Sequence, residues 1–62
     1  MASEEEKRKI ARQFFTRATQ AESKQNWDYA VEMWQNAVKL VPDNQEFRLH
    51  LRLAQRQKHG NN

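Results

Sequence analysis

Apolar residues recur at intervals of three and four along most of the chain, which is the period of an amphipathic α-helix. The first such segment begins after Ser3, which is followed by Glu6 at the spacing of a capping box. Its apolar positions fall on one stripe and are Ile10, Ala11, Phe14, Phe15, Ala18 and Ala21. The pattern predicts a first helix over residues 4–24.

A second helix is predicted over residues 27–40. Asn26 can cap its start through the side-chain oxygen. Pro42 predicts its end, because the proline ring disfavours a helical conformation at Val41. The apolar stripe between these two signals consists of Trp27, Ala30, Val31, Trp34, Ala37 and Val38. Short connections on both sides of this helix predict antiparallel neighbours.

A third helix is predicted over residues 44–58. Asp43 or Asn44 can cap its start. Gly60 stands where a C-terminal glycine cap belongs, within a short tail over 59–62.

The leucines of this third segment alternate with charged residues, which is also the period of a β-strand. A helix is favoured because the segment lacks β-branched residues and no other segment could pair with it. In a helix, Phe47, Leu51 and Ala54 form one face that can pack inward. Leu49 and Leu53 lie nearly opposite, and nothing in this chain is left to cover them. The fold class predicted is all-α, with a helix-turn-helix hairpin followed by a C-terminal capping helix.

Composition narrows the ways in which this fold can be stable. The chain has 62 residues, enough for one domain that buries only about 60% of the surface its unfolded form exposes. There is no cysteine, so neither a disulfide nor a cysteine-ligated zinc can staple it. Regular helix packing or self-association remains as the source of stability.

The sequence contains few residues of the types that serve in catalysis or metal binding. Ser3 and Ser23 have no histidine next to them in the sequence, and the single glycine, Gly60, cannot form a phosphate-binding loop. His50 and His59 are too far apart, and too poorly supported by other ligands, to form a metal site. We therefore expect no enzymatic activity, no cofactor and no metal.

Charge is distributed unevenly around a formal net charge of +3. All eight acidic residues lie in residues 1–46, whereas Arg48, Arg52 and Arg56 follow at intervals of four in the third helix. A solvated basic face is the favoured interpretation, and contact with nucleic acid or an acidic protein surface is the alternative. No apolar run approaches the roughly 18 residues of a membrane span. Because the charged start also lacks the features of an export signal, we expect no membrane association and a cytoplasmic location.

Residues 11–44 resemble one tetratricopeptide repeat, a helix-turn-helix unit of about 34 residues. The residues that carry the resemblance are Phe14, Ala18, Trp27, Ala30, Trp34, Ala37 and Pro42. The chain departs from the family pattern at Arg17, where leucine is usual, at Ala21, where tyrosine is usual, and at Gln25, where the turn glycine is usual. The third helix then resembles the first helix of a following repeat, used as a cap.

The resemblance implies a non-enzymatic protein–protein interaction module. The family's groove positions carried onto this chain are Arg12, Phe15, Thr19, Glu22, Leu49, Leu53 and Arg56. Phe15 and Thr19 replace the lysine and asparagine with which one subfamily clamps a terminal carboxylate, so that clamp is absent. An apolar groove of this kind would bind an amphipathic helix, an extended peptide or a second copy of the chain. Self-association is favoured over a structural role as a fragment of a longer repeat array, although both explain the uncovered face.

Overall fold

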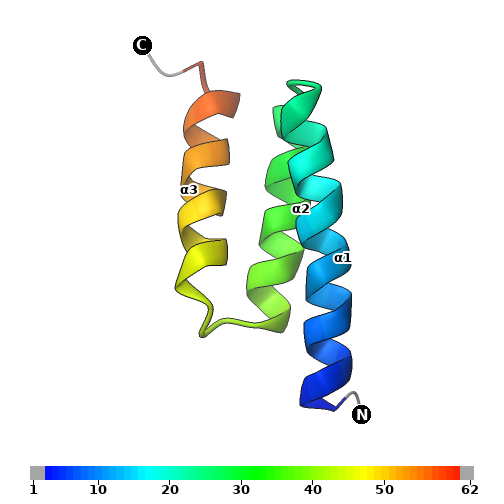
Figure 1. Ribbon diagram of the computed structural model, residues 1–62. Helices are drawn as coiled ribbons and strands as arrows, with labels where there is room; N and C mark the ends of the chain where they lie inside the picture. Colours follow the sequence, from blue (N-terminus) through cyan, green and yellow to red (C-terminus); the bar gives the residue numbers. More distant parts are fainter. Residues whose placement is uncertain (1–2, 61–62) are drawn as a thin grey trace.

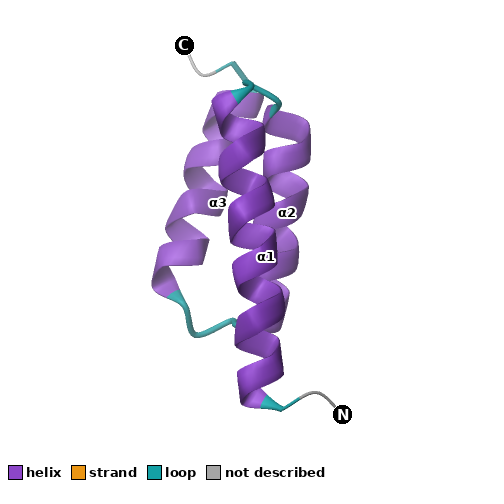
Figure 2. Cartoon of the chain, turned by 45° about the vertical axis from the view of Figure 1, so that its right-hand side comes forward, coloured by secondary structure: helices purple, strands orange, loops and turns teal. Residues whose placement is uncertain are grey.

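The computed structural model describes residues 3–60 and shows an all-α fold of three helices (Figures 1 and 2). The helices are α1 (Glu4–Ser23), α2 (Trp27–Leu40) and α3 (Gln45–Lys58). Helix α2 runs antiparallel to α1 and α3 and packs against both, so α1 and α3 run in the same direction. The three predicted helices are confirmed, and α3 is helical rather than extended. Residues 61–62 of the predicted tail and residues 1–2 of the predicted charged start lie outside the described residues.

All three helices begin at the predicted type of cap. The Ser3 hydroxyl accepts a hydrogen bond from the Glu6 backbone N–H at 3.1 Å and lies 3.4 Å from the Glu6 carboxylate, to which it donates. Asn26 and Asn44 each accept a bond through Oδ1 from the backbone N–H three residues later, at 3.4 and 3.1 Å. Of the two candidates for α3, Asn44 rather than Asp43 is the cap. Such caps satisfy backbone donors that the first helical turn leaves free.

Helix α1 ends in a Schellman motif built on a residue other than glycine. The backbone N–H of Asn26 donates to the Ala21 carbonyl at 2.8 Å, and that of Gln25 donates to the Glu22 carbonyl at 2.9 Å. This pair of bonds requires a left-handed residue, and Gln25 has a φ of 61°. A side chain in this region costs roughly 1–2 kcal/mol relative to the right-handed region.

The ends of the other two helices agree with their sequence signals. Val41 has left the helical region, with φ −130° and ψ 73°, immediately before Pro42. Gly60 adopts a φ of 62° after the last turn of α3, as expected of a glycine cap. Pro42 itself is exposed, so its contribution is to end α2 rather than to fill the core.

The core forms where α2 meets its two neighbours. Trp34 is the one large side chain that is completely buried within the described residues. The buried residues are Ala11, Ala18, Ala21, Ala30, Val31, Met33, Trp34, Ala37, Phe47 and Ala54. Of the other predicted repeat positions, Phe14 and Trp27 are half-buried and pack against this core. Alanines dominate the α1–α2 contact, and small side chains of this kind allow two helix backbones to approach closely.

The three helices form a thin, elongated body. Its Cα extents are 41 × 20 × 15 Å. The start of α1 and the end of α3 lie at opposite ends of the long axis (Figure 1). A body this thin leaves much of each helix exposed to solvent, so any binding site formed by the described residues lies on the surface.

Candidate functional site

An aromatic cluster joins the three helices at the middle of the molecule. The Phe15 ring from α1 packs edge-on against Trp34 from α2, with centroids 5.3 Å apart and planes at 86°. From α3, His50 stacks on the indole at 4.6 Å and 11°, and Phe47 lies 6.0 Å from it. Phe15 also lies 6.2 Å from Phe47 and 6.1 Å from His50. Phe15, predicted to line an open groove, is therefore half-buried between α1 and α3.

A hydrogen bond reaches the same indole from α1. The Nε1–H of Trp34 donates to Oε2 of Glu22 at 2.8 Å. A fully buried tryptophan needs such an acceptor, because its polar N–H has otherwise been removed from water without compensation. Glu22, predicted as a groove residue, is thus held by the core and ties the end of α1 to the centre of α2.

A groove of about 760 Å³ opens between the N-terminal half of α1 and the start of α3. Its apolar residues are Ala11, Phe15, Val41 and Phe47. Its polar residues are Arg8, Arg12 and Thr16 from α1 and Asp43, Asn44 and Glu46 from the α2–α3 connection and α3. One wall is therefore basic and the other acidic.

Only two of the seven predicted groove residues, Arg12 and Phe15, line this groove. Sequence reasoning missed Arg8, Asp43 and Glu46. Arg8 could have been found, since it lies four residues before Arg12 and so shares its helix face.

The other predicted contact residues of α3 lie elsewhere, on the face turned away from the core. We call Arg48, Leu49, Arg52, Leu53 and Arg56 the outer face of α3; all five are exposed. Leu49 and Leu53 expose 54% and 46% of their surface, whereas Phe47 and Ala54 on the opposite side are buried. The predicted division of α3 into two faces is confirmed, but the predicted continuous groove is divided into two separate surfaces.

Thr19, the remaining predicted groove residue, is half-buried on α1. Its hydroxyl donates to the Thr16 carbonyl at 2.9 Å within the same helix. Its hydroxyl hydrogen is therefore already engaged by the backbone of α1.

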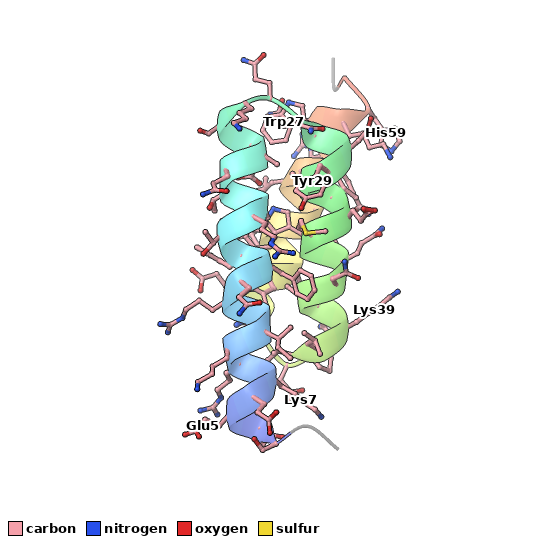
Figure 3. All side chains as sticks on the ribbon, turned by 90° about the vertical axis from the view of Figure 1, so that its right-hand side faces the viewer. Glu5, Lys7, Trp27, Tyr29, Lys39 and His59 are labelled. Carbon is pink, nitrogen blue, oxygen red and sulfur yellow. The ribbon has the colours of Figure 1, made fainter. Side chains whose placement is uncertain are left out.

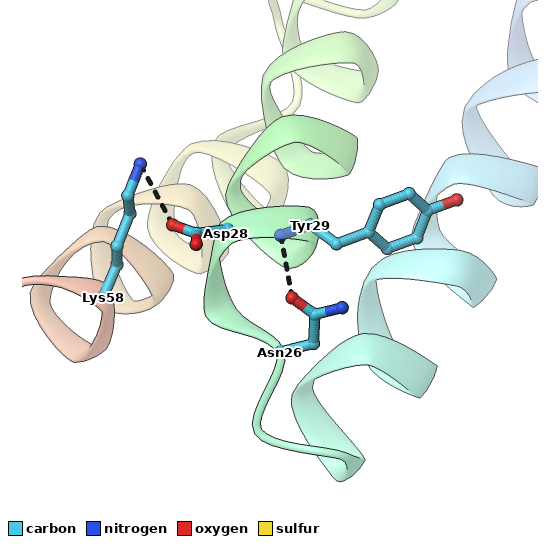
Figure 4. A network of polar contacts seen from close by, with 4 residues as sticks. All are labelled: Asn26, Asp28, Tyr29 and Lys58. Carbon is cyan, nitrogen blue, oxygen red and sulfur yellow. Dashed lines mark hydrogen bonds and ion pairs between the residues drawn. The ribbon is translucent and has the colours of Figure 1, made fainter.

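Ion pairing leaves the arginines of α3 free. Within residues 3–60 a single ion pair forms, between Lys58 Nζ and Asp28 Oδ1 at 3.4 Å, which joins the end of α3 to the start of α2 (Figure 4). Both side chains are largely exposed, so this pair stabilises the fold by at most about 1 kcal/mol. Arg48, Arg52 and Arg56 have no carboxylate within ion-pair distance in the same part of the chain. Other charged side chains, such as Glu5 and Lys39, also project into solvent (Figure 3).

Residues 3–60 contain no group of three histidine or acidic side chains that could hold a metal ion. Among the three helices, none combines the length and apolarity needed to cross a bilayer.

Comparisons with protein families, with characterised proteins and with solved structures find no match.

Proposed function

We propose that this chain is a non-enzymatic protein–protein interaction module of the tetratricopeptide-repeat type. It binds a helix or peptide of another polypeptide, or a second copy of itself, through the groove beside α1 and the outer face of α3. The observation that carries the proposal is the pair Leu49 and Leu53, two large apolar side chains exposed one turn apart on the same helix. Single exposed leucines are ordinary, but an adjacent pair forms a strip that an apolar partner can cover.

The repeat type is supported by where the small residues lie. Ala18 in α1 and Ala30 and Ala37 in α2, three of the positions that carry the resemblance, are completely buried. A unit of this type has an apolar face that neighbouring units normally cover. Within the described residues no helix covers the outer face of α3, and a partner that covers it would bury Leu49 and Leu53.

Sedimentation equilibrium of the wild type and of Leu49→Glu with Leu53→Glu tests the proposal. We expect concentration-dependent association of the wild type over about a hundredfold range, and a monomeric double variant, because the substitutions remove the apolar surface that a partner would bury. Gln13→Glu with Gln20→Glu adds the same charge at exposed positions of α1 and should associate like the wild type.

Helical circular dichroism of each variant shows whether it is folded. An assembly that survives in the folded leucine variant would contradict the assignment of this interface. A wild-type monomer at every concentration would exclude the second copy as the partner and leave the heterologous helix, which the peptide titrations described below detect directly.

A second candidate function is binding of nucleic acid by the α3 arginines. The specific observation in its favour is that Arg48, Arg52 and Arg56 are exposed without acidic partners in the described residues. Phosphate contacts release counterions, so such binding must weaken steeply as salt increases. Titration of the protein with duplex DNA at low and at moderate salt tests this candidate, and an affinity that does not fall with salt would contradict it.

A further inference from the structure

We propose that the partner of the outer face of α3 is an acidic amphipathic helix from a different polypeptide. The inference rests on the proposed interaction function and adds the chemical class of the partner. It follows from the position of the two exposed leucines relative to the three arginines, and from the way these charges would meet in each alternative complex.

The leucines define the shape of the partner. Leu49 and Leu53 are four residues apart, so they stand about one helical turn, or about 6 Å, from each other along α3. The apolar face of an incoming helix has side chains at the same spacing, at positions i, i+3, i+4 and i+7. Two helices can therefore pack along this strip with leucines in register.

The arginines define the charge of the partner. Arg48, Arg52 and Arg56 continue along one edge of the leucine strip at intervals of four, spanning about two turns, or about 12 Å. Carboxylates on successive turns of a helix beside the strip would match this spacing. Each guanidinium can hold a carboxylate through two parallel hydrogen bonds. Because no acid of the described chain is bound to them, all three are available.

A second copy cannot supply this complement. In a two-fold pair with antiparallel α3 helices, the arginine edge of one copy would lie against the arginine edge of the other. In a parallel two-fold pair the arginine edge would meet the opposite edge of α3, where Glu46 is the single acid beside His50 and Gln57. Self-association through this face therefore leaves most of the arginine charge without a partner.

Nucleic acid matches the surface less well than an acidic helix does. Two of the five residues of the outer face are exposed leucines, and burying them requires an apolar counterpart that a phosphate backbone lacks. The arginines lie on one edge of a single helix rather than around a concave basic groove.

The test is a titration with synthetic helical peptides of about 18 residues, followed by fluorescence anisotropy of a labelled peptide. The first peptide has leucine at the i, i+3, i+4 and i+7 positions and glutamate beside them. The second replaces each glutamate with lysine, and the third keeps the glutamates but replaces each leucine with serine. Duplex DNA is the fourth ligand. We expect the leucine–glutamate peptide to bind at least tenfold more tightly than the other three.

Variants of the protein locate the contact. Arg48→Gln with Arg52→Gln and Arg56→Gln should weaken binding of the leucine–glutamate peptide roughly tenfold or more. The control is a second triple variant, Lys9→Gln with Arg17→Gln and Lys24→Gln, which loses the same three positive charges from exposed positions in and just after α1. Its affinity should stay within about twofold of the wild type.

Each other outcome overturns a defined part of the proposal. If the lysine peptide binds as tightly as the glutamate peptide, the leucine strip is a binding surface but its partner is not acidic. If the serine peptide or DNA binds as tightly, the surface recognises negative charge alone, and the amphipathic helix is wrong. If no peptide binds while the leucine-dependent assembly is seen in sedimentation, the partner class fails and the interaction function stands. If neither is observed, both fail.

Discussion

Gln25 is the one described residue other than glycine with a positive φ. It is placed there by two hydrogen bonds that end α1, and the next residue, Asn26, must at once cap α2. Both demands fall on the three residues that join the helices, Lys24 to Asn26. The connection therefore combines a sharp change of direction with some backbone strain.

Gln25→Gly should raise the free energy of unfolding by about 0.5–1 kcal/mol, because glycine adopts the left-handed region without steric cost. In a domain of this size, that corresponds to an increase of several degrees in the melting temperature. Gln35→Gly, at an exposed position within α2, is the matched control and should destabilise by about 1 kcal/mol. Thermal denaturation followed by circular dichroism measures both, and equal effects of the two substitutions would show that Gln25 is not strained.

At the scale of the helices, the contact between α1 and α2 combines close alanine packing with one directed hydrogen bond. Small alanine side chains allow the two backbones to approach, and the Trp34 indole N–H donates across the contact to Glu22. Helix α3 adds Phe47 and His50, which pack against the same indole. Trp34 therefore contacts side chains from both of the other helices.

Glu22→Ala should lower the free energy of unfolding by about 1–2 kcal/mol, since it leaves the buried indole N–H without an acceptor. Glu22→Gln keeps an acceptor oxygen and should recover most of the loss. Glu32→Ala, at an exposed position of α2, should change stability by no more than about 0.5 kcal/mol. Urea denaturation provides the comparison, and a glutamine variant as unstable as the alanine variant would argue against the hydrogen bond.

Much of this arrangement could be predicted because its signals are local. The apolar period, Asn26 and Asn44 as caps, and Pro42 after α2 each act over four residues or fewer. The site could be predicted only in part. The two faces of α3 follow from its apolar period, as predicted. The groove positions assigned by resemblance place Phe15 beside Leu49 and Leu53, whereas Phe15 packs half-buried against Phe47 and His50, and these tertiary contacts have no local pattern in the sequence.

At the scale of the whole molecule, the groove and the outer face of α3 differ in their charge pattern. The groove has Arg8 and Arg12 facing Asp43 and Glu46, so it is close to neutral. The outer face of α3 has positive charge only. Self-association through the groove should therefore weaken as salt increases, whereas self-association through the outer face of α3 should strengthen.

Self-association through paired α3 helices, where sedimentation detects it, should strengthen severalfold between about 0.05 and 0.5 M salt, because screening reduces repulsion between the arginines of the two copies. Binding of the leucine–glutamate peptide should weaken over the same range. Sedimentation equilibrium and anisotropy at both ionic strengths provide the comparison. Self-association that weakens with salt would instead indicate pairing of oppositely charged surfaces, such as the walls of the groove.

The complete burial of Trp34 gives the protein an optical signal of its own fold. The chain has two tryptophans, and the other, Trp27, lies half-buried at the end of the molecule where α1 turns into α2 (Figure 3). Acrylamide should quench the emission of Trp27 readily and that of Trp34 hardly at all. A Trp27→Phe protein would then emit from the central indole alone, and its spectrum would shift to the red when the three helices separate.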